Sequence, residues 1–225
     1  MVSVLPFPAG CDKLQQSRHS RRGCGGRSRS EMALTEIRRK WNRRYADWLA
    51  EGAAPEPNPL ALRFRHRVHG GIVLDAACGL GPGIAALLDR AERFIGVDLS
   101  EAALAEARRR FGGDRRILWI QADVARLRWP PGLFSAVCAF GFTDWEFLRQ
   151  APGIVRPGGA FFYQGFSPRQ REVKPTLDPD WTSTPETIAA LFAGWEVLAC
   201  EETDEPPFRV SFAGCRPADE QQEHA

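Results

Sequence analysis

Three closely spaced glycines follow an apolar segment in the stretch VLDAACGLGPG, residues 73–83. Gly79, Gly81 and Gly83 carry no Cβ and tolerate positive φ, so a ligand can approach the main chain there. A helix that begins near Pro82 would add free N–H groups and the positive end of its dipole, which favour a negatively charged ligand group. The pattern therefore predicts a nucleotide-type binding turn between a buried strand and a helix.

Acidic residues stand at the ends of the next two apolar segments. Asp98 closes FIGVDLS, where a carboxylate can accept two hydrogen bonds from ribose hydroxyls, and its alternative role is to cap the helix that follows. Asp123 lies in IQADVARL, with an ordinary loop acid as the alternative. Asp75, inside the first segment, either holds the glycine turn by hydrogen bonds or contacts the ligand, and both interpretations stay open.

The glycine spacing separates the nucleotide-binding classes. The dinucleotide fingerprint G-x-G-x-x-G or G-x-G-x-x-A fails because Ile84 stands in its last place, and no Gly-Lys-Ser/Thr of a P-loop follows. The stretch fits Asp-x-x-x-Gly-x-Gly-x-Gly instead and resembles the class I methyltransferases that use S-adenosylmethionine. The segment IVRPGGAFFYQGF is similar to the turn before the fifth strand of that family.

This resemblance implies a cofactor site at the carboxyl ends of the first strands. It assigns Asp123 to the adenine amino group, beside the backbone N–H of Val124. For Cys78 a role as a small buried residue is favoured over ligand contact. The implied contacts with S-adenosylmethionine are Asp75, Ala77, Cys78, Gly79, Gly81, Asp98, Leu99, Asp123, Val124 and Phe140.

Segments on both sides of these motifs resemble the tellurite-resistance methyltransferase-like group. The likeness lies in KWNRRYADWLAEGAAPEPNPL and in the Pro-rich segment that leads to WEV, and it carries over to Trp41, Tyr45, Phe192 and Trp195. It implies an N-terminal helix that covers the cofactor. The segment GFTDWEF departs from the group's pattern, so the methyl acceptor is not assigned by the resemblance.

The acceptor side is expected beyond the fourth and fifth strands. None of the four histidines lies in the segment directly after the fourth strand, which favours an acceptor that needs no strong base: a thiol, or a selenium or tellurium oxyanion. Packing is favoured for Phe140 and Tyr163, and an N-cap role for Asp144. No catalytic residue is assigned; the acceptor-side candidates are Tyr45, Phe142, Asp144, Trp145 and Tyr163, with Trp41, Phe140, Thr143, Gln164 and Phe166 also able to line it.

Alternating strand and helix patterns must position these residues. Crossover helices between strands require a mostly parallel sheet covered on both faces, so the expected fold is α/β, a doubly wound seven-stranded sheet with an antiparallel last strand. Strands are expected at 72–76, 94–97, 117–121, 134–140, 160–165, 195–200 and 208–214. Helices are expected from Thr35 as N-cap to before Gly52, at 59–68, after the glycine turn, after the caps Ser100 and Thr184, and at 145–155.

Length and charge set the domain organisation. The 225 residues suit one domain. Residues 1–31 carry a net charge of +4, and the whole chain carries +2, so the residues after 31 have a net charge of about −2. We expect a disordered basic tail at 1–31 and one methyltransferase domain at 32–225, comprising a helical lid at 32–69, the core sheet at 70–216 and a tail at 217–225. Translation from Met32 is favoured for the first segment over a targeting segment or an arm for anionic partners.

Composition also indicates surroundings and partners. The six scattered cysteines favour free thiols in the cytoplasm and no metal site. The acidic balance after residue 31 predicts no nucleic-acid partner, and the absence of a long apolar run predicts no membrane span. A monomer or homodimer with a small-molecule acceptor is expected. The competing interpretations are a non-catalytic module that keeps the fold as a scaffold, and a nicotinamide-dependent oxidoreductase, which the glycine spacing disfavours.

Overall fold

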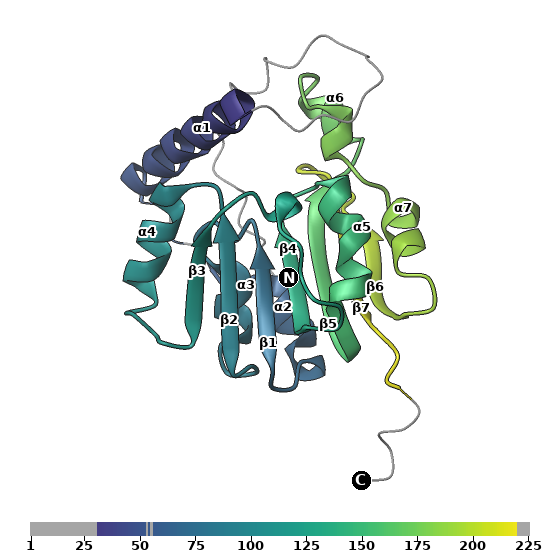
Figure 1. Cartoon of the computed structure of the whole chain (residues 1–225). Helices are drawn as coiled ribbons and strands as arrows, with labels where there is room; N and C mark the ends of the chain where they lie inside the picture. Colours follow the sequence, from purple (N-terminus) through teal and green to yellow (C-terminus); the bar gives the residue numbers. More distant parts are fainter. Residues whose placement is uncertain (1–30, 53, 55, 220–225) are drawn as a thin grey trace.

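A mixed seven-stranded sheet organises the part of the chain that the computed structural model describes, residues 31–52, 54 and 56–219 (Figure 1). The strand order is β3-β2-β1-β4-β5-β7-β6, and β7 is antiparallel to both of its neighbours. The predicted fold class is confirmed. The strands are β1 (Ile72–Ala76), β2 (Arg93–Asp98), β3 (Ile117–Gln121), β4 (Phe134–Phe140), β5 (Val155–Phe166), β6 (Glu196–Glu202) and β7 (Arg209–Cys215).

Helices cover both faces of the sheet. One buried cluster packs α5 and α7 against β1, β4, β5 and β7, and a second packs α2 and α3 against the other face. The helices are α1 (Glu31–Ala50), α2 (Pro59–Phe64), α3 (Pro82–Leu87), α4 (Glu101–Arg110), α5 (Trp145–Ile154), α6 (Gln170–Val173) and α7 (Pro185–Leu191). Short 3₁₀ turns are η1 (Arg65–Arg67), η2 (Val124–Arg126) and η3 (Pro179–Trp181).

Short polar side chains start several of these helices, as the sequence predicts. The Ser100 hydroxyl accepts from the Ala103 amide at 3.2 Å and caps α4. Thr184 and Thr187 form a reciprocal capping box at α7, with Pro185 in the first turn. These caps fix where each crossover helix begins and hence where the loops at the carboxyl ends of the strands lie.

The structure differs from the sequence-based expectation at three places. Thr35 is not an N-cap, because α1 begins at Glu31 and runs through it. The helix expected at 59–68 ends as α-helix at Phe64 and tightens into η1. The turn expected at Arg156–Gly159 lies inside β5 as an irregularity, because the pairing of β5 with β4 shifts register between Phe134 and Ala136.

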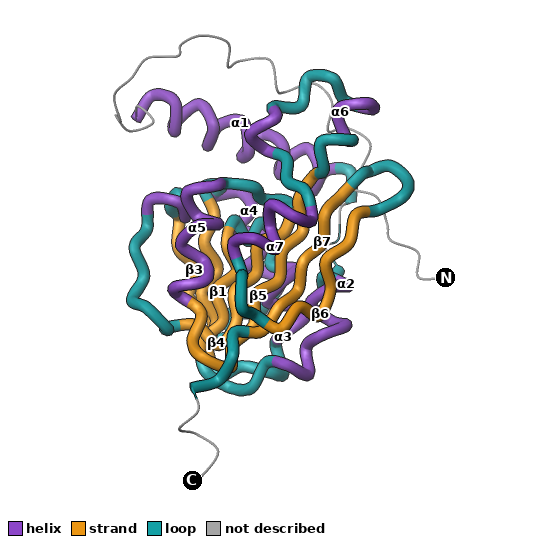
Figure 2. The backbone as a smooth tube through the Cα atoms, turned by 90° about the vertical axis from the view of Figure 1, so that its right-hand side faces the viewer, coloured by secondary structure: helices purple, strands orange, loops and turns teal. Residues whose placement is uncertain are grey.

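The helix α1 and the Pro-rich segment containing α6 lie at the same end of the sheet (Figure 2). Asn42 attaches α1 to the start of α4: its side-chain oxygen accepts from the Ser100 hydroxyl at 2.8 Å, and its nitrogen donates to Glu101 at 3.1 Å. Apart from Glu31, the predicted tail at 1–31 lies outside the described residues. Among the described helices, none combines the length and the apolar character that crossing a bilayer requires.

Candidate functional site

The glycine turn joins β1 to α3 and has positive φ at two of its glycines, 52° at Gly79 and 83° at Gly81. A Cβ on residue 81 would come within 2.7 Å of the Phe111 ring, and a Cβ on Gly83 within 2.7 Å of the Asp75 carboxylate. At both positions the missing Cβ leaves space for a neighbouring side chain, and at Gly81 glycine also permits the positive φ. Only at Gly79 does the missing Cβ face the lid helix, where the Tyr45 hydroxyl lies.

Asp75 lies beneath the turn and does not line the cavity. Its carboxylate accepts from the Ile84 amide at 3.1 Å, so it holds the first turn of α3. Burial raises the pKa of Asp75 from 3.8 to about 8, and the backbone N–H groups of Ile84 and Gly83 act in the opposite direction. Of the two interpretations left open by the sequence, the hydrogen bond to the glycine turn is the one with geometry to support it.

Asp98 ties the glycine turn to the end of β2. One carboxylate oxygen accepts from the Gly79 amide at 2.8 Å and the other from the Ser100 amide at 2.7 Å. Asp98 also lines the cavity, and an ionised carboxylate offers about four lone-pair sites, more than these two amides use. Burial raises the pKa of Asp98, while the amides of Ser100 and Gly79 favour the charged form.

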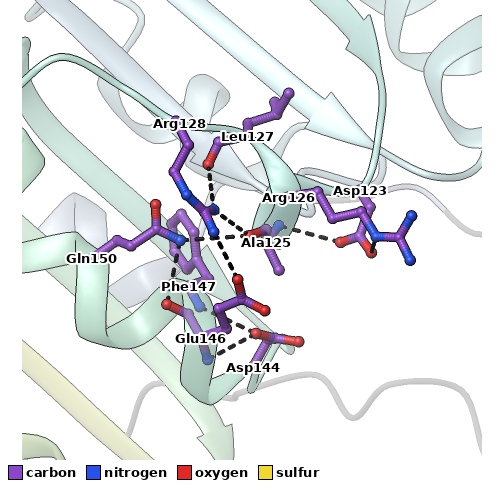
Figure 3. A network of polar contacts seen from close by, with 9 residues as sticks. All are labelled: Asp123, Ala125, Arg126, Leu127, Arg128, Asp144, Glu146, Phe147 and Gln150. Atoms are coloured by element: carbon purple, nitrogen blue, oxygen red, sulfur yellow. Dashed lines mark hydrogen bonds and ion pairs between the residues drawn. The ribbon is translucent and has the colours of Figure 1, made fainter. Parts of the chain in front are cut away.

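Asp123 follows β3 and starts η2, where it accepts from the Ala125 amide at 3.2 Å. Figure 3 shows how this loop is held: Arg128 donates to the Ala125 carbonyl at 3.0 Å and to Glu146 of α5 at 2.9 Å. Asp123 and Val124 both line the cavity beside Asp98. The loop after β3 and the start of α5 are therefore positioned by one network of contacts.

The lid helix α1 lies over the cavity. Trp41, Arg44, Tyr45 and Trp48 line it, and the Arg44 guanidinium stacks 4.5 Å from the Trp48 ring centre. Burial raises the pKa of Tyr45 well above 10, with the negative charge of Asp98 acting in the same direction. The Tyr45 hydroxyl is therefore a neutral group at the glycine turn.

Sheet residues complete the cavity. Phe140 ends β4 and Gln164 lies opposite it in β5, so their side chains share one face of the sheet. Phe142 follows β4 and packs its ring 5.9 Å from Phe147. The described cavity lining consists of Trp41, Arg44, Tyr45, Trp48, Ala77, Val97, Asp98, Leu99, Ala122, Asp123, Val124, Phe140, Gly141, Phe142, Gln164, Gly165, Phe166 and Arg209.

The structure places several predicted site residues away from this cavity. Cys78 is buried against Gly96, and burial raises the pKa of its thiol. Asp144 caps α5, accepting from the Glu146 and Phe147 amides at 3.0 and 3.1 Å. Trp145 packs against the buried cluster of α5 and α7.

Tyr163 projects to the face of the sheet opposite that of its neighbour Gln164 and is buried in the cluster that Trp145 contacts. Its hydroxyl is 2.8 Å from both Thr143 Oγ1 and Ser183 Oγ. Tyr163 and Thr143 thus join the loop after β4 to the loop before α7 and do not line the cavity.

Two charged residues of the cavity, Arg44 and Arg209, are not predicted from the sequence. Arg44 lies between Trp41 and Tyr45 in the lid helix, where it looks like a solvent-facing residue of an amphipathic helix. Arg209 begins β7, and it reaches the cavity only because β7 is inserted beside β5. The inserted antiparallel strand is a property of topology, so Arg209 could not be placed from the local pattern. The described residues contain no cluster of three metal-ligating side chains.

Comparison with known proteins agrees with this architecture. Residues 73–159 match the family described as "Methyltransferase domain". A protein of Mycolicibacterium smegmatis, named as a probable S-adenosylmethionine-dependent methyltransferase, is 31% identical over 146 residues, which are 60% of this chain and 56% of the relative. The demethylmenaquinone methyltransferase of Clavibacter sepedonicus is 32% identical over 105 residues, 44% of this chain and 43% of the relative.

Among solved structures, the magnesium protoporphyrin IX methyltransferase of Synechocystis PCC 6803 with bound S-adenosylhomocysteine superimposes with a TM-score of 0.58. It is 16% identical, and the alignment covers 81% of this chain and 99% of that one, which shows a shared fold. The chain spans about half the length of the two curated relatives (56% and 43%). Residues 73–159 are therefore similar to a methyltransferase domain, and the Mycolicibacterium smegmatis relative is named as dependent on the methyl donor S-adenosylmethionine.

The residues present fit this donor. Asp98 lines the cavity and has more acceptor sites than its two amide partners use, and Asp123 and Val124 lie beside it at the end of the neighbouring strand. On the resemblance described above, we propose that Asp98 holds the ribose and that Asp123, with the Val124 N–H, holds the adenine.

Proposed function

We propose that the whole protein transfers a methyl group from S-adenosylmethionine to a small-molecule acceptor with a soft or ionised nucleophile, such as a thiol or a selenium or tellurium oxyanion. The observation that carries the proposal is the position of Asp98 and Asp123. Asp98 ends β2, Asp123 follows the neighbouring strand β3, and both line one cavity, to which the glycine turn is tied through Asp98.

When bound, S-adenosylmethionine supplies a methyl group on a sulfonium: the carbon–sulfur bond breaks with its electron pair left on sulfur, and the nucleophile's lone pair forms the new bond. The chain has to hold the reactants in line and exclude water, and positioning of this kind supplies several kcal/mol of catalysis. Aromatic walls at Trp41, Phe140 and Phe142 provide a dry surface next to the site. Aromatic faces also attract a cation by about 1–2 kcal/mol when desolvated.

The ionisable groups of the cavity support an acceptor that arrives already ionised. Tyr45 has a raised pKa and is a poor base at neutral pH. Asp98 and Asp123 are engaged by backbone amides at the end that we assign to the cofactor. The other charged lining residues, Arg44 and Arg209, are cations. A thiolate or an oxyanion needs no proton removed at the moment of transfer, whereas an alcohol does.

The proposal extends to the setting of the protein. The segments around Trp41 and Trp195 resemble the tellurite-resistance methyltransferase-like group, which supports a small-molecule acceptor. The cysteine pattern supports a cytoplasmic location. Assay of S-adenosylhomocysteine release with thiols, selenite and tellurite would test the acceptor class, and a protein that turns over none of them while binding the cofactor would contradict it.

Calorimetric titration with S-adenosylhomocysteine tests the cofactor site. We expect micromolar binding, no binding of NAD, and a loss of about tenfold or more in affinity for Asp98→Ala, because hydrogen bonds to a charged group contribute about 1.5–3 kcal/mol each. Asp89→Asn is the matched control, since Asp89 is an exposed acid paired with Arg65 outside the cavity. Equal affinity in a folded Asp98→Ala protein, or no binding by the parent, would overturn the cofactor assignment.

A further inference from the structure

One wall of the cavity is built by strand pairing beyond β4. Gln164 of β5 lies opposite Phe140 on one side and Ser211 on the other, and Phe166 lies opposite Arg209 of β7. Directly paired residues of neighbouring strands project to the same face. Phe140, Gln164, Phe166 and Arg209 therefore form one surface of the cavity, which we call the acceptor wall.

The Arg209 side chain is fixed within this wall. Its guanidinium lies 3.5 Å from the Gln164 side-chain oxygen and 6.0 Å from the Phe166 ring centre, and the residue is only 8% exposed. The Gln164 nitrogen donates to the Ser211 hydroxyl at 3.2 Å, which directs the oxygen toward Arg209. An arginine stays charged in proteins and presents a planar set of donors that suits a carboxylate. The wall thus carries a permanent, oriented positive charge.

The lid helix α1 places a second cation, Arg44, in the lining of the cavity. Arg44 is also 8% exposed, and its guanidinium is 4.5 Å from the Trp48 ring centre and 5.7 Å from that of Trp41. The same cavity therefore has one buried guanidinium on the sheet and one on α1, with aromatic rings next to both.

The acids of the cavity lie at its other end. Asp98 belongs to β2 and Arg209 to β7, and four strand spacings separate these strands, about 19 Å at ~4.8 Å each. Because Asp98 and Asp123 take the cofactor in the proposed function, Arg209 marks the acceptor's end. From β4 to β7 the distance is two spacings, about 10 Å, which suits one aromatic ring with substituents at opposite ends.

Building on the proposed function, we propose that the acceptor is an aromatic carboxylic acid whose carboxylate binds Arg209, with Arg44 as a second cation of the same cavity, and whose nucleophile points toward the end of β4. Phe140, Phe142 and Phe166 contact the ring. Arg209 is a specificity-determining residue in this arrangement, because it selects acids over their neutral analogues without taking part in the bond exchange.

The test compares a carboxylic acid with its amide, which has a similar shape and no charge. We would titrate 4-mercaptobenzoate and 4-mercaptobenzamide into the full chain, with and without saturating S-adenosylhomocysteine. We expect the acid to bind about tenfold or more tightly than the amide, Arg209→Gln to remove this difference, and Arg209→Lys to retain part of it. Arg63→Gln is the matched control, because Arg63 is an exposed arginine paired with Glu201 outside the cavity.

Two results would overturn the inference: equal binding of acid and amide by the parent protein, or an unchanged preference in Arg209→Gln. The affinity for S-adenosylhomocysteine, measured in the same samples, shows whether each variant keeps its cofactor site. A parent that fails to bind S-adenosylhomocysteine but prefers the acid through Arg209 would refute the proposed function and leave the anion site standing. Binding of S-adenosylhomocysteine without any preference for the acid would refute the anion site and leave the proposed function standing.

Discussion

The hydroxyl of Tyr45 lies against Gly79, so close that a Cβ on residue 79 would overlap it. The contact joins the lid helix α1 to the turn that follows β1. Gly79 also donates its amide to Asp98, so one residue touches the lid and the acid that we assign to the cofactor's ribose. A shift of α1 would therefore change the contacts of Gly79 at the end of the cavity that we assign to the cofactor.

This contact predicts non-additive effects at the two positions. Gly79→Ala should lower the free energy of unfolding by about 1–3 kcal/mol, since residue 79 has φ of 52° and its new Cβ meets the Tyr45 hydroxyl. In a Tyr45→Phe background the cost should shrink by about 1 kcal/mol, because the overlap with the hydroxyl is gone while the backbone strain and a 3.1 Å approach to the ring remain. Urea unfolding of the four proteins measures the coupling, and identical costs in both backgrounds would show that the hydroxyl does not restrict residue 79.

Gly83 and Gly153 offer a matched pair of glycines within helices. A Cβ at Gly83 would lie 2.7–2.9 Å from the Asp75 carboxylate, whereas one at Gly153 has no neighbour within 4 Å. Gly83→Ala should destabilise the protein by about 1–3 kcal/mol through overpacking. Gly153→Ala should stabilise it by about 0.4–1 kcal/mol, because alanine loses less backbone entropy in a helix. Thermal unfolding should show a lower melting temperature for Gly83→Ala and a higher one for Gly153→Ala. Equal shifts in melting temperature would refute the packing role of Gly83.

The sequence predicts the sheet well because its signals are local. The apolar run at Phe134–Phe140, the cap at Ser100 and the Thr184-Pro185 helix start each depend on neighbouring residues, and all three are confirmed. The start of α1 is missed because Thr35 has the chemistry of a cap but lies inside a longer helix.

The candidate site is harder to predict from the sequence, because the sheet topology brings together residues that are far apart in the chain. Asp98 and Asp123 can be anticipated, since they stand at or just after the ends of strands that the sequence predicts. Arg209 cannot, because its place beside Phe166 depends on the insertion of β7 next to β5. Gly81 and Gly83 share a motif with Gly79, yet their missing Cβ atoms accommodate Phe111 and Asp75, contacts that no spacing rule reveals.

Asp144 is predicted to stabilise the start of α5 as its N-cap and to have no role as a general base for the acceptor. Asp144→Ala should cost about 0.5–2 kcal/mol of stability, and Asp144→Ser should restore most of it, because serine is also a good N-cap. Affinity for S-adenosylhomocysteine and the rate of methyl transfer should follow the folded fraction. A general base would give the opposite pattern, with both variants stable enough to fold and both unable to turn over.

The buried carboxyl of Asp75 should make stability depend on pH. Its pKa is about 8 in the folded protein against 3.8 for the free group, so the folded state binds more protons than the unfolded state between these values. The free energy of unfolding must then fall as pH rises through this window, by up to about 1.4 kcal/mol per pH unit. Asp98, whose pKa is also raised by burial, contributes in the same direction.

Replacing the carboxyl isolates this contribution. Asp75→Asn cannot ionise and keeps an oxygen that can accept from the Ile84 amide, so the variant should gain stability relative to the parent as pH rises from 5 to 8. Urea unfolding at each pH measures the difference, and Asp89→Asn, at an exposed acid, supplies the control slope. If the parent and Asp75→Asn have parallel pH profiles, the carboxyl is ionised in the folded protein. The backbone amides beneath the glycine turn would then outweigh the cost of burial.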